Sequence, residues 1–353
     1  MSVGENVVVP VREMHRLDET RLAAYLREHL EGFEDGMRLA QFEGGQSNPT
    51  YFIQAGGREY VLRKKPPGTL LPSAHNVARE YEVMTALDKA GFVAPKTYLM
   101  CRDESIVGTE FYVMEKVRGR VLRDVLLPEL DPGERTALYN SFIDTLAAMH
   151  NVDFEAVGLG EFGKHGDYCA RQIHRWSKQY VASKTDDIPE MDRLMAWLPE
   201  NIPAEDATAA AVVHGDFRIE NAIVHPTEPR IVAILDWELS TLGNPLSDLG
   251  YCCMGYRADI ASTGSSLHDA DWQALGIPDE AAFLARYCEK TGRDRVEHWN
   301  FYIAYSLFRV AAIIQGVYKR GLDGNSSNPR AIEFADHCRR RAAQGWAIAN
   351  GEG

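Results

Sequence analysis

The chain has 353 residues and a formal net charge of -13, with 45% hydrophobic and 25% charged residues. This length permits one large domain or two closely packed lobes, and the composition is typical of a globular protein with a sizeable core. The acidic balance argues against general nucleic-acid binding, which usually brings a basic balance or a basic stripe. We therefore expect no nucleic-acid partner, although a local basic pocket for a phosphate is compatible with this charge.

The six cysteines include no Cys-x-x-Cys pair, and only Cys252 and Cys253 are close in sequence. This spacing argues against a zinc ribbon or a disulfide framework and favours free thiols in a reducing compartment. The N-terminal segment lacks the basic stretch and the apolar stretch of a signal peptide, and no apolar run approaches the length of a membrane span. We expect a cytoplasmic protein without a membrane partner.

Apolar spacing and turn residues predict a strand-rich N-terminal part. Its expected elements are a helix over residues 18–30, three strands within residues 37–68, a helix over residues 73–91 and a strand over residues 109–117. Asp18 or Thr20 is the expected N-cap of the first helix, and Ser73 that of the second. From about residue 119 the pattern becomes helical.

Two long segments of this second part carry apolar residues at steps of three and four. They cover residues 134–150 and 299–317, and both are typical of core helices. The sequence therefore predicts an α+β protein, in which a strand-rich lobe over residues 1–117 precedes a mainly helical lobe over residues 118–353.

The stretch VVHGDFRIENAIV, residues 212–224, places His214, Asp216 and Asn221 between two apolar runs. The following segment, HPTEP, separates two β-branched runs and predicts a hairpin loop. If the pairing continues without interruption, Asn221 lies near Ile234, and Asp236 projects from the same end of the hairpin. Asp216 lies on the loop just before, so we expect Asp216, Asn221 and Asp236 to converge.

These residue types suit one particular chemistry. Asn221 and Asp236 offer hard oxygen ligands for Mg²⁺, which takes few protein ligands and leaves room for phosphate oxygens and water. Asp216 would then face an acceptor hydroxyl as a base. A positioned acceptor, a base and a metal that bridges phosphates are the parts that phosphoryl transfer requires.

Two other interpretations compete with this one. Asp and Asn side chains often cap turns, but capping does not explain why all three should meet. A zinc site could use His214, Asp216, His225 and Asp236, but His225 lies at the far end of the hairpin. For His214 we expect a buried, hydrogen-bonded structural role. We expect Asp248 to brace the loop after Asp236 by hydrogen bonds.

A phosphotransferase also needs a nucleotide site, which we place in the strand-rich lobe. The segment FEGGQSNPTYFI joins two expected strands, and its backbone N–H groups could contact phosphates. The candidate residues in this segment are Gly44, Gly45, Ser47 and Asn48.

The next strand supplies a cation for the phosphates. Val61, Arg63 and Lys65 share one face by strand alternation, so Arg63 could pair with the α- and β-phosphates. Glu80 on the following helix could pair with Arg63 and fix its position. The segment from Met114 to Val117, which includes Glu115, could offer backbone groups to an adenine.

At this point the chain resembles the aminoglycoside phosphotransferase family of small-molecule kinases. The resemblance rests on HGDFRIEN followed by ILDWE, and it extends roughly from Leu39 to Gly321. It implies a bilobal, protein-kinase-like fold that uses ATP, or GTP, with Mg²⁺. Asp216 matches the catalytic base, and Asn221 and Asp236 match the metal ligands.

Two further residues follow from the same resemblance. Glu80 matches the family's helix glutamate, and Arg63 stands where the family usually has a lysine that binds phosphate. This departure leaves Lys64 and Lys65 as alternative cations. Residues 1–117 would form the nucleotide-binding lobe, and residues 118–353 the catalytic and substrate-binding lobe.

Within the family the chain looks most like the branch associated with acyl-CoA dehydrogenases. The segments that carry this likeness are VLRKKPPG, LPSAHNVAREY, VGLGEFG and DWELSTLGNPLSDLGY. The branch implies a small-molecule hydroxyl acceptor, such as a hydroxyacyl-CoA, and a functional link to an acyl-CoA dehydrogenase. The alternatives are an aminoglycoside kinase and a catalytically silent nucleotide-binding regulator.

Overall fold

The computed structural model describes residues 8–42, 48–66, 76–260, 265–326 and 330–352. The chain forms two compact units. The first comprises Met1–Leu122, Val157–Leu159 and Glu220–Ser240, and the second comprises Arg123–Ala156, Gly160–Ile219 and Thr241–Gly353. The first unit thus includes Glu220–Ser240, a segment from later in the chain. A single division after residue 117 would place this segment in the second unit.

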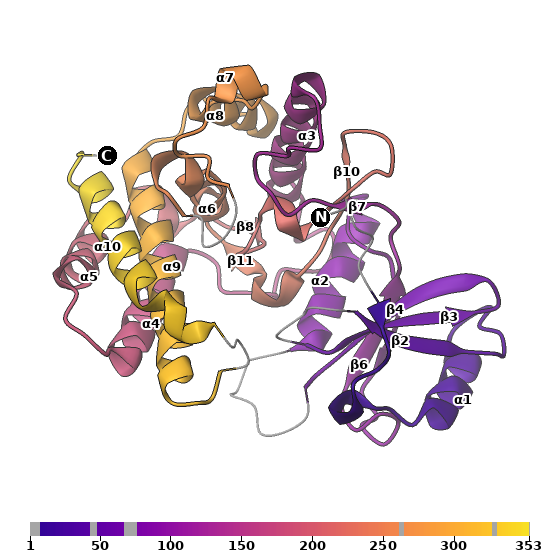
Figure 1. Ribbon diagram of the computed structural model, residues 1–353. Coiled ribbons are helices and arrows are strands. Elements are labelled where there is room, and N and C mark those ends of the chain that lie inside the picture. The colour runs from indigo at the N-terminus through magenta and orange to yellow at the C-terminus, as the bar shows by residue number, and fades with distance from the viewer. Residues whose placement is uncertain (1–7, 43–47, 67–75, 261–264, 327–329, 353) are drawn as a thin grey trace. The chain divides into compact units, whose positions relative to one another are not determined.

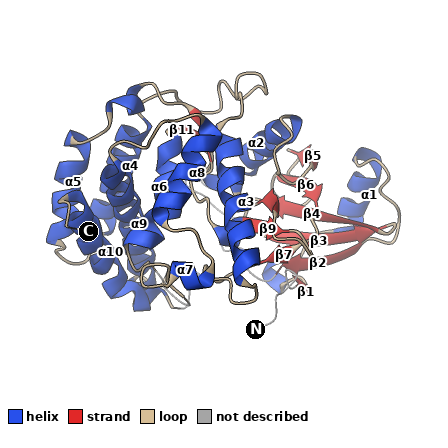
Figure 2. Cartoon of the chain, turned by 90° about the horizontal axis from the view of Figure 1, so that it is seen from above, coloured by secondary structure: helices blue, strands red, loops and turns tan. Residues whose placement is uncertain are grey.

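The first unit is built on an antiparallel sheet (Figures 1 and 2). Its strands, within the described ranges, are β1 (Val8–Val9), β2 (Arg38–Phe42), β3 (Thr50–Ala55), β4 (Arg58–Lys64), β5 (Thr97–Cys101) and β6 (Phe111–Glu115). They lie in the order β1-β2-β3-β4-β6-β5, and each neighbouring pair is antiparallel. The strands expected within residues 37–68 and 109–117 are therefore confirmed as β2, β3, β4 and β6.

Two helices accompany this sheet. Helix α1 (Glu19–His29) begins after Asp18, whose side chain accepts a hydrogen bond from the Arg21 N–H, as the sequence predicts. Helix α2 (Val77–Lys89) begins after Asn76, whose side chain accepts from the Arg79 N–H. The predicted cap Ser73 lies outside the described residues, and Asn76 fills the capping role because its amide oxygen reaches the first turn.

Side chains of this sheet alternate between two faces. One face packs against α1 and includes Leu62 of β4. The other face carries Val61 and Arg63, which line a cavity. Lys64 points to the first face, where its Nζ donates to the carbonyl oxygen of Val107. Strand alternation therefore places Arg63, and not Lys64, on the cavity face, while Lys65 follows the last residue of β4 and pairs with Glu110.

The returning segment of the first unit forms a smaller sheet. Strands β9 (Ala222–Val224) and β10 (Ile231–Ile234) form the expected hairpin, closed by a hydrogen bond from the His225 N–H to the Arg230 carbonyl oxygen. Strand β7 (Arg120–Val121) pairs with β9 on the other side. The segment from residue 220 thus belongs to the first unit through backbone pairing.

The second unit is mainly helical (Figure 2). Its helices, in the described part of the chain, are α3 (Pro132–His150), α4 (Tyr168–Ser183), α5 (Pro189–Glu200), α6 (Pro245–Arg257), α7 (Trp272–Leu275), α8 (Glu280–Thr291), α9 (Trp299–Leu322) and α10 (Ala335–Ala349). Strands β8 (Ala211–Val213) and β11 (Thr241–Gly243) pair antiparallel within it. The helices predicted over residues 134–150 and 299–317 are confirmed as parts of α3 and α9.

Helix α9 is long and apolar enough to cross a membrane by length and composition alone. This corrects the expectation that no apolar run approaches that length. However, 72% of its most apolar window is buried within the protein. It packs against α4, α6 and α10, so its apolar surface forms the core of the second unit.

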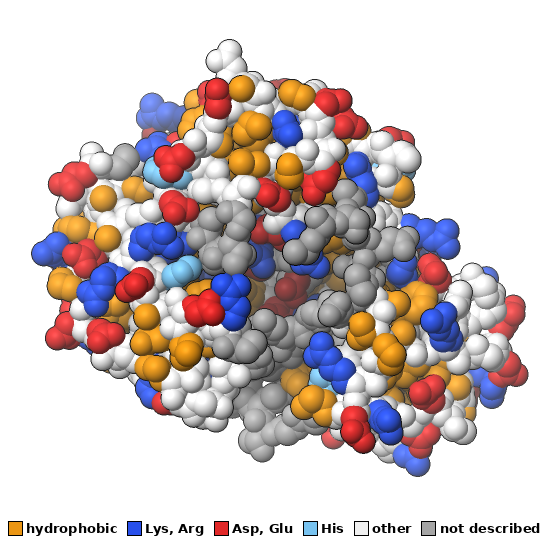
Figure 3. Space-filling view, in the orientation of Figure 1, with side chains coloured by type: hydrophobic (Ala, Val, Ile, Leu, Met, Phe, Trp, Pro, Cys, Tyr) orange, Lys and Arg blue, Asp and Glu red, His pale blue; other side chains and the backbone are white. Residues whose placement is uncertain are grey.

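The surface is of mixed charge on the face drawn in Figure 3, where lysine and arginine side chains lie among aspartates and glutamates. The net charge of -13 is therefore not gathered into one acidic patch on this face. Such a mixed surface is typical of a protein whose net charge serves solubility.

Gly119, just before β7, lies very close to the backbone of β9. A Cβ atom at Gly119 would lie 2.3 Å from the carbonyl oxygen of Val224. Gly119→Ala should therefore lower the free energy of unfolding by about 1–3 kcal/mol, because backbone atoms must move apart. The control is Gly133→Ala in the first turn of α3, which should leave stability equal or slightly higher. Urea denaturation measures both, and a Gly119→Ala variant as stable as the wild type would contradict the close approach.

Candidate functional site

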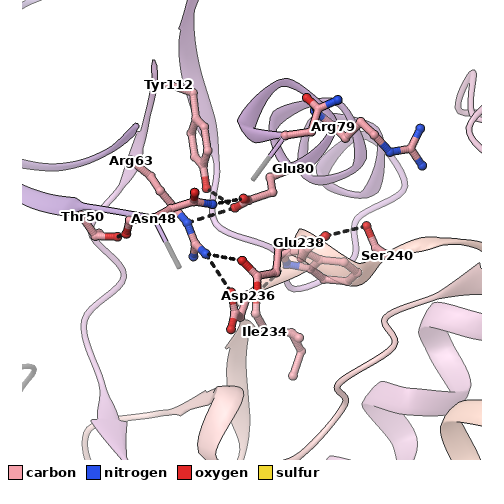
Figure 4. A network of polar contacts seen from close by, with 12 residues as sticks. Asn48, Thr50, Arg63, Arg79, Glu80, Tyr112, Ile234, Asp236, Glu238 and Ser240 are labelled. Atoms are coloured by element: carbon pink, nitrogen blue, oxygen red, sulfur yellow. Dashed lines mark hydrogen bonds and ion pairs between the residues drawn. The ribbon is translucent and has the colours of Figure 1, made fainter. Parts of the chain in front are cut away.

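Arg63 of β4 lies among three carboxylates of the first unit (Figure 4). Its Nε lies 3.2 Å from Oε2 of Glu80, and its Nη2 lies 2.8 Å from Oδ1 of Asp236 and 3.5 Å from Oε2 of Glu238. We call these four residues the Arg63 cluster. They come from β4, from α2 and from the turn after β10, so a single guanidinium ties three segments together.

Glu80 is the most enclosed member of the Arg63 cluster, with 1% of its surface exposed. Asn48 donates to its Oε1 at 2.9 Å, and the Tyr112 hydroxyl donates to its Oε2 at 3.0 Å. Burial raises the pKa of Glu80, and Arg63 counteracts that effect. The predicted pair of Glu80 with Arg63 is present, and Asn48 contributes to it through its side chain.

Arg63 itself stays charged. Burial alone would lower the pKa of Arg63, but Glu80, Tyr112, Asp236 and Glu238 together hold that pKa above its ordinary value. Three carboxylates surround this one guanidinium, so negative charge is in excess within the Arg63 cluster. A divalent cation near Asp236 would relieve that excess.

Asn221 and Asp236 lie at the same end of the β9–β10 hairpin. The Leu235 N–H donates to the carbonyl oxygen of Asn221 at 2.8 Å, and Ile234 pairs with Ala222. The sequence placed Asn221 opposite Ile234. A bulge between Ile231 and Ala233 shifts the register by one residue and brings Asn221 one position closer to Asp236.

Asp236 has the left-handed backbone conformation, with φ 68°, and precedes the short helix η4 (Trp237–Leu239). This conformation is uncommon for a residue with a side chain, though aspartate adopts it more often than most. The turn directs the Asp236 carboxylate toward Arg63 (Figure 4). Strained positions of this kind persist where the surrounding structure holds them, and they are common at functional sites.

A cavity of about 540 Å³ opens beside the Arg63 cluster within the first unit. Arg63 and Asp236 line it, and so do the predicted adenine-contacting residues Glu115 and Val117. Its size falls in the range of small-molecule and cofactor sites. The predicted loop residues Gly44, Gly45 and Ser47 lie outside the described residues.

The donor set fits a nucleotide with Mg²⁺. Asn221 and Asp236 offer amide and carboxylate oxygens, which are the hard ligands that Mg²⁺ prefers. The two alternative cations contact other groups, because Lys64 donates to a carbonyl oxygen and Lys65 pairs with Glu110 at 3.2 Å. Among the residues that the structure describes, no three His, Cys, Asp or Glu side chains form a group that could hold a metal, so nothing supports the alternative zinc site.

Asp216 belongs to the second unit, where it lies on the 214–217 loop that follows β8. The Asp248 carboxylate, on the first turn of α6, accepts from the His214 N–H at 2.6 Å and from the Gly215 N–H at 2.9 Å. Asp248 therefore braces the loop before Asp216. This corrects the expectation that it braces the loop after Asp236.

His214 has the structural role that the sequence suggests. It is fully buried, and its Nδ1 accepts from the Asp216 N–H at 3.1 Å. The Asp216 carboxylate contacts Tyr251, whose hydroxyl donates to Oδ1 at 2.5 Å, and Arg218, whose Nε lies 3.4 Å from Oδ2. Convergence of Asp216 with Asn221 and Asp236, which lie in the other unit, stays a prediction.

Several polar residues in the Arg63 cluster and around the 214–217 loop were missed by the sequence analysis. Glu238 follows Asp236 by two positions, and its acidic side chain was the available signal. Tyr251 follows Asp248 by one helical turn, so the two share the face of α6 that contacts the 214–217 loop. His150, whose Nε2 lies 3.6 Å from Asp248, comes from the distant helix α3, and no local pattern points to it.

The bonds around Asp248 predict a stability effect. Burial alone would raise the pKa of Asp248, but His150, His214 and the His214 backbone N–H outweigh it and hold that pKa below the ordinary value. Asp248→Asn replaces one acceptor with a donor and should lower the free energy of unfolding by on the order of 3 kcal/mol at pH 7.

The same residue predicts a pH dependence. A carboxylate with a depressed pKa stabilises the fold above its unfolded-state pKa of about 4, and that contribution is lost as pH falls through the lower folded-state value. The stability difference between wild type and Asp248→Asn should therefore shrink below about pH 4 in urea titrations. The exposed Asp187→Asn is the control and should leave the free energy of unfolding at pH 7 nearly unchanged. A difference that persists unchanged at low pH would contradict the role of the Asp248 charge.

Comparison with known proteins places the chain in a family. Residues 38–299 match the phosphotransferase enzyme family. Acyl-CoA dehydrogenase family member 10 of Mus musculus is 44% identical over 346 residues, which is 98% of this chain and 32% of that protein. The chain spans between 32% and 45% of the length of this relative and of the human acyl-CoA dehydrogenase family member 11.

Solved structures agree with this assignment. A Ralstonia eutropha protein, provisionally described as an aminoglycoside phosphotransferase, is 47% identical and has a TM-score of 0.86, with 95% of this chain and 99% of that chain covered. An aminoglycoside phosphotransferase in complex with ADP and hygromycin B is 16% identical, with a TM-score of 0.59, and covers 94% of this chain and 99% of its own. That second likeness concerns the kinase-like fold alone. The chain belongs to the phosphotransferase enzyme family.

Proposed function

We propose that the protein uses Mg²⁺ and ATP to transfer the γ-phosphoryl group to a hydroxyl of a small molecule, and that this molecule is a hydroxyacyl-CoA. The observation that carries the proposal is the Arg63 cluster beside the cavity of the first unit. It combines a fixed cation for phosphates with hard oxygen ligands for a metal.

Each predicted site residue described in the first unit has a role in this proposal. The adenine would lie against the segment that includes Glu115 and Val117, and Arg63 would bind the α- and β-phosphates. Asn221 and Asp236 would hold Mg²⁺, which supplies neutralisation of the charge on the phosphate oxygens. Glu80 keeps Arg63 in place through the 3.2 Å ion pair.

Asp216 would act on the acceptor. Its carboxylate accepts the proton of the attacking hydroxyl and orients that oxygen toward the γ-phosphorus. Only four residues separate Asp216 from Asn221 in the chain, and the change from the second unit to the first falls between them. Asp216 and the proposed metal ligand are therefore linked by a short segment of backbone.

The charge beside Asp216 favours an anionic acceptor. Arg218, whose side chain is half exposed, pairs with Asp216. A cation at this position would attract the phosphates of coenzyme A and disfavour a polycationic aminoglycoside. The names of the curated relatives support a functional link to an acyl-CoA dehydrogenase, which we also propose.

An acceptor panel tests the proposed function. The purified protein is incubated with Mg²⁺ and γ-labelled ATP or GTP, and with 3-hydroxybutyryl-CoA, longer hydroxyacyl-CoAs, free hydroxy acids or hygromycin B. We expect label in a hydroxyacyl-CoA product, lost on chelation of Mg²⁺. Label only in hygromycin B would indicate an aminoglycoside kinase. Nucleotide binding without transfer to any acceptor would indicate a silent regulator.

Asp216→Asn tests the proposed base. The change keeps the shape of the side chain and removes its charge, so the variant should fold normally and bind Mg²⁺–ATP nearly as the wild type does. The transfer rate should fall by about 10²- to 10⁴-fold, which is the usual loss when a positioned base is removed. Steady-state kinetics and nucleotide-binding calorimetry measure the two effects. An unchanged transfer rate would mean that Asp216 only holds the loop.

Arg63→Ala tests the proposed phosphate contact, and Asp236→Ala tests the metal contact. Arg63→Ala should raise the KM for ATP and lower kcat, because a guanidinium can bind phosphate through two parallel N–H bonds. Asp236→Ala should be the more damaging change, because it removes a charge next to the cation. Lys65→Ala is the matched control, since Lys65 pairs with Glu110 and should leave both constants unchanged. The opposite order of effects for Arg63 and Lys65 would contradict the assignment.

A further inference from the structure

Tyr251 makes the shortest described side-chain contact with the proposed base. Its hydroxyl donates to Oδ1 of Asp216 at 2.5 Å. Tyr251 lies on α6 one turn after Asp248, and the thiol of the next residue, Cys252, donates to the carbonyl oxygen of Phe217 at 3.0 Å. One face of α6 therefore contacts both the backbone of the 214–217 loop and the carboxylate that the loop carries.

Arg309 of α9 fixes both partners of this contact. Its Nη2 donates to the Gly215 carbonyl oxygen at 2.5 Å, and its guanidinium lies 5.3 Å from the centre of the Tyr251 ring. It also lies 5.7 Å from the ring of Trp176, and only 6% of its surface is exposed. A buried guanidinium in contact with two aromatic rings has little freedom to move, so it restrains the Tyr251 ring.

The phenol of Tyr251 is a donor throughout the physiological pH range. Burial raises the pKa of Tyr251 well above its ordinary value, and the neighbouring Asp216 raises it further. An ionised carboxylate only accepts hydrogen bonds, so the Tyr251–Asp216 bond runs in one direction and engages Oδ1. The other oxygen, Oδ2, lies on the side of Arg218.

Oδ2 faces a partner that can be displaced. Arg218 lies 3.4 Å from Oδ2, and 49% of its side chain is exposed. Exposed ion pairs of this kind contribute little to stability, because solvent screens them and two flexible side chains must be held. The contact of Arg218 with Oδ2 is thus longer and more exposed than the contact of Tyr251 with Oδ1.

We propose that Tyr251 is the residue that positions Asp216 for phosphoryl transfer, by holding Oδ1 so that Oδ2 receives the proton of the acceptor hydroxyl. This inference rests on the proposed function. In the step, the acceptor oxygen forms a bond to the γ-phosphorus, the bond from that phosphorus to the ADP oxygen breaks, and the hydroxyl proton moves to Oδ2. Tyr251 keeps its own proton and acts through the orientation of the carboxylate.

A double-mutant cycle on the transfer rate tests this role, with 3-hydroxybutyryl-CoA and hygromycin B as acceptor probes. Tyr251→Phe keeps the ring against Arg309 and removes only the hydroxyl. It should lower kcat by about 10- to 100-fold and leave the KM for ATP within about twofold, since the loss concerns a charge-assisted hydrogen bond to the base. In the Asp216→Asn background the same change should lower kcat by less than about threefold, because no carboxylate is left to orient.

Tyr256→Phe is the matched control on the same helix. The Tyr256 hydroxyl donates to the Pro278 carbonyl oxygen at 2.8 Å and is also buried, so its loss removes a hydrogen bond of similar burial away from Asp216. This variant should unfold at lower urea concentration than the wild type and keep its kcat. A merely structural role for Tyr251 would make the two phenylalanine variants behave alike.

The outcomes separate the inference from the proposed function. If the wild type transfers phosphate and Tyr251→Phe keeps its kcat, or loses the same factor with and without the Asp216 carboxylate, the positioning role is wrong and the kinase assignment stands. If the wild type transfers phosphate to none of the acceptors in the panel described above, the proposed function fails. The positioning contact is then judged by unfolding, where additive effects of Tyr251→Phe and Asp216→Asn on the urea midpoint would overturn it as well.

Discussion

The ion pairs of Arg63 with Glu80, Asp236 and Glu238 are the interaction on which the first unit's site depends. Strand β4, helix α2 and the turn after β10 are tied together by this guanidinium. A buried cation with several carboxylates is stable only when every partner is held, because removal of one leaves a charge without compensation. In our proposal Arg63 therefore has two roles, because it orders Asp236, the proposed metal ligand, and offers N–H groups to phosphate.

In the second unit, hydrogen bonds to the backbone restrain the 214–217 loop. Asp248 accepts from two consecutive N–H groups of the 214–217 loop. Arg309 donates to the carbonyl oxygen of Gly215, the residue that precedes Asp216. Gly215 has φ 82°, a conformation that a side chain would disfavour. The loop is thus held from two helices, α6 and α9, and in our proposal this restraint pre-organises Asp216 for catalysis.

Much of this could be predicted where the signal is local. Strand alternation places Arg63 and not Lys64 on the cavity face, turn residues predict the β9–β10 hairpin, and apolar spacing predicts α3 and α9. The wrong predictions concern an irregular strand pairing and contacts between segments that are distant in sequence. A bulge within β10 moved the partner of Asn221 by one residue, and Asp248 braces the loop before Asp216 because α6 packs beside β8. His150 and Arg309 reach the site from α3 and α9, which no sequence window near residue 216 contains.

A crystal structure of the protein with Mg²⁺ and a non-hydrolysable ATP analogue tests the central claim most directly. Our account predicts that the adenine ring contacts residues 114–117 and that phosphate oxygens lie within hydrogen-bonding distance of Arg63. It also predicts a metal bound by both Asn221 and Asp236 at about 2.1 Å. A nucleotide outside the cavity of the first unit would contradict the account. So would a metal that contacts neither residue, or a guanidinium of Arg63 that stays bound only to carboxylates.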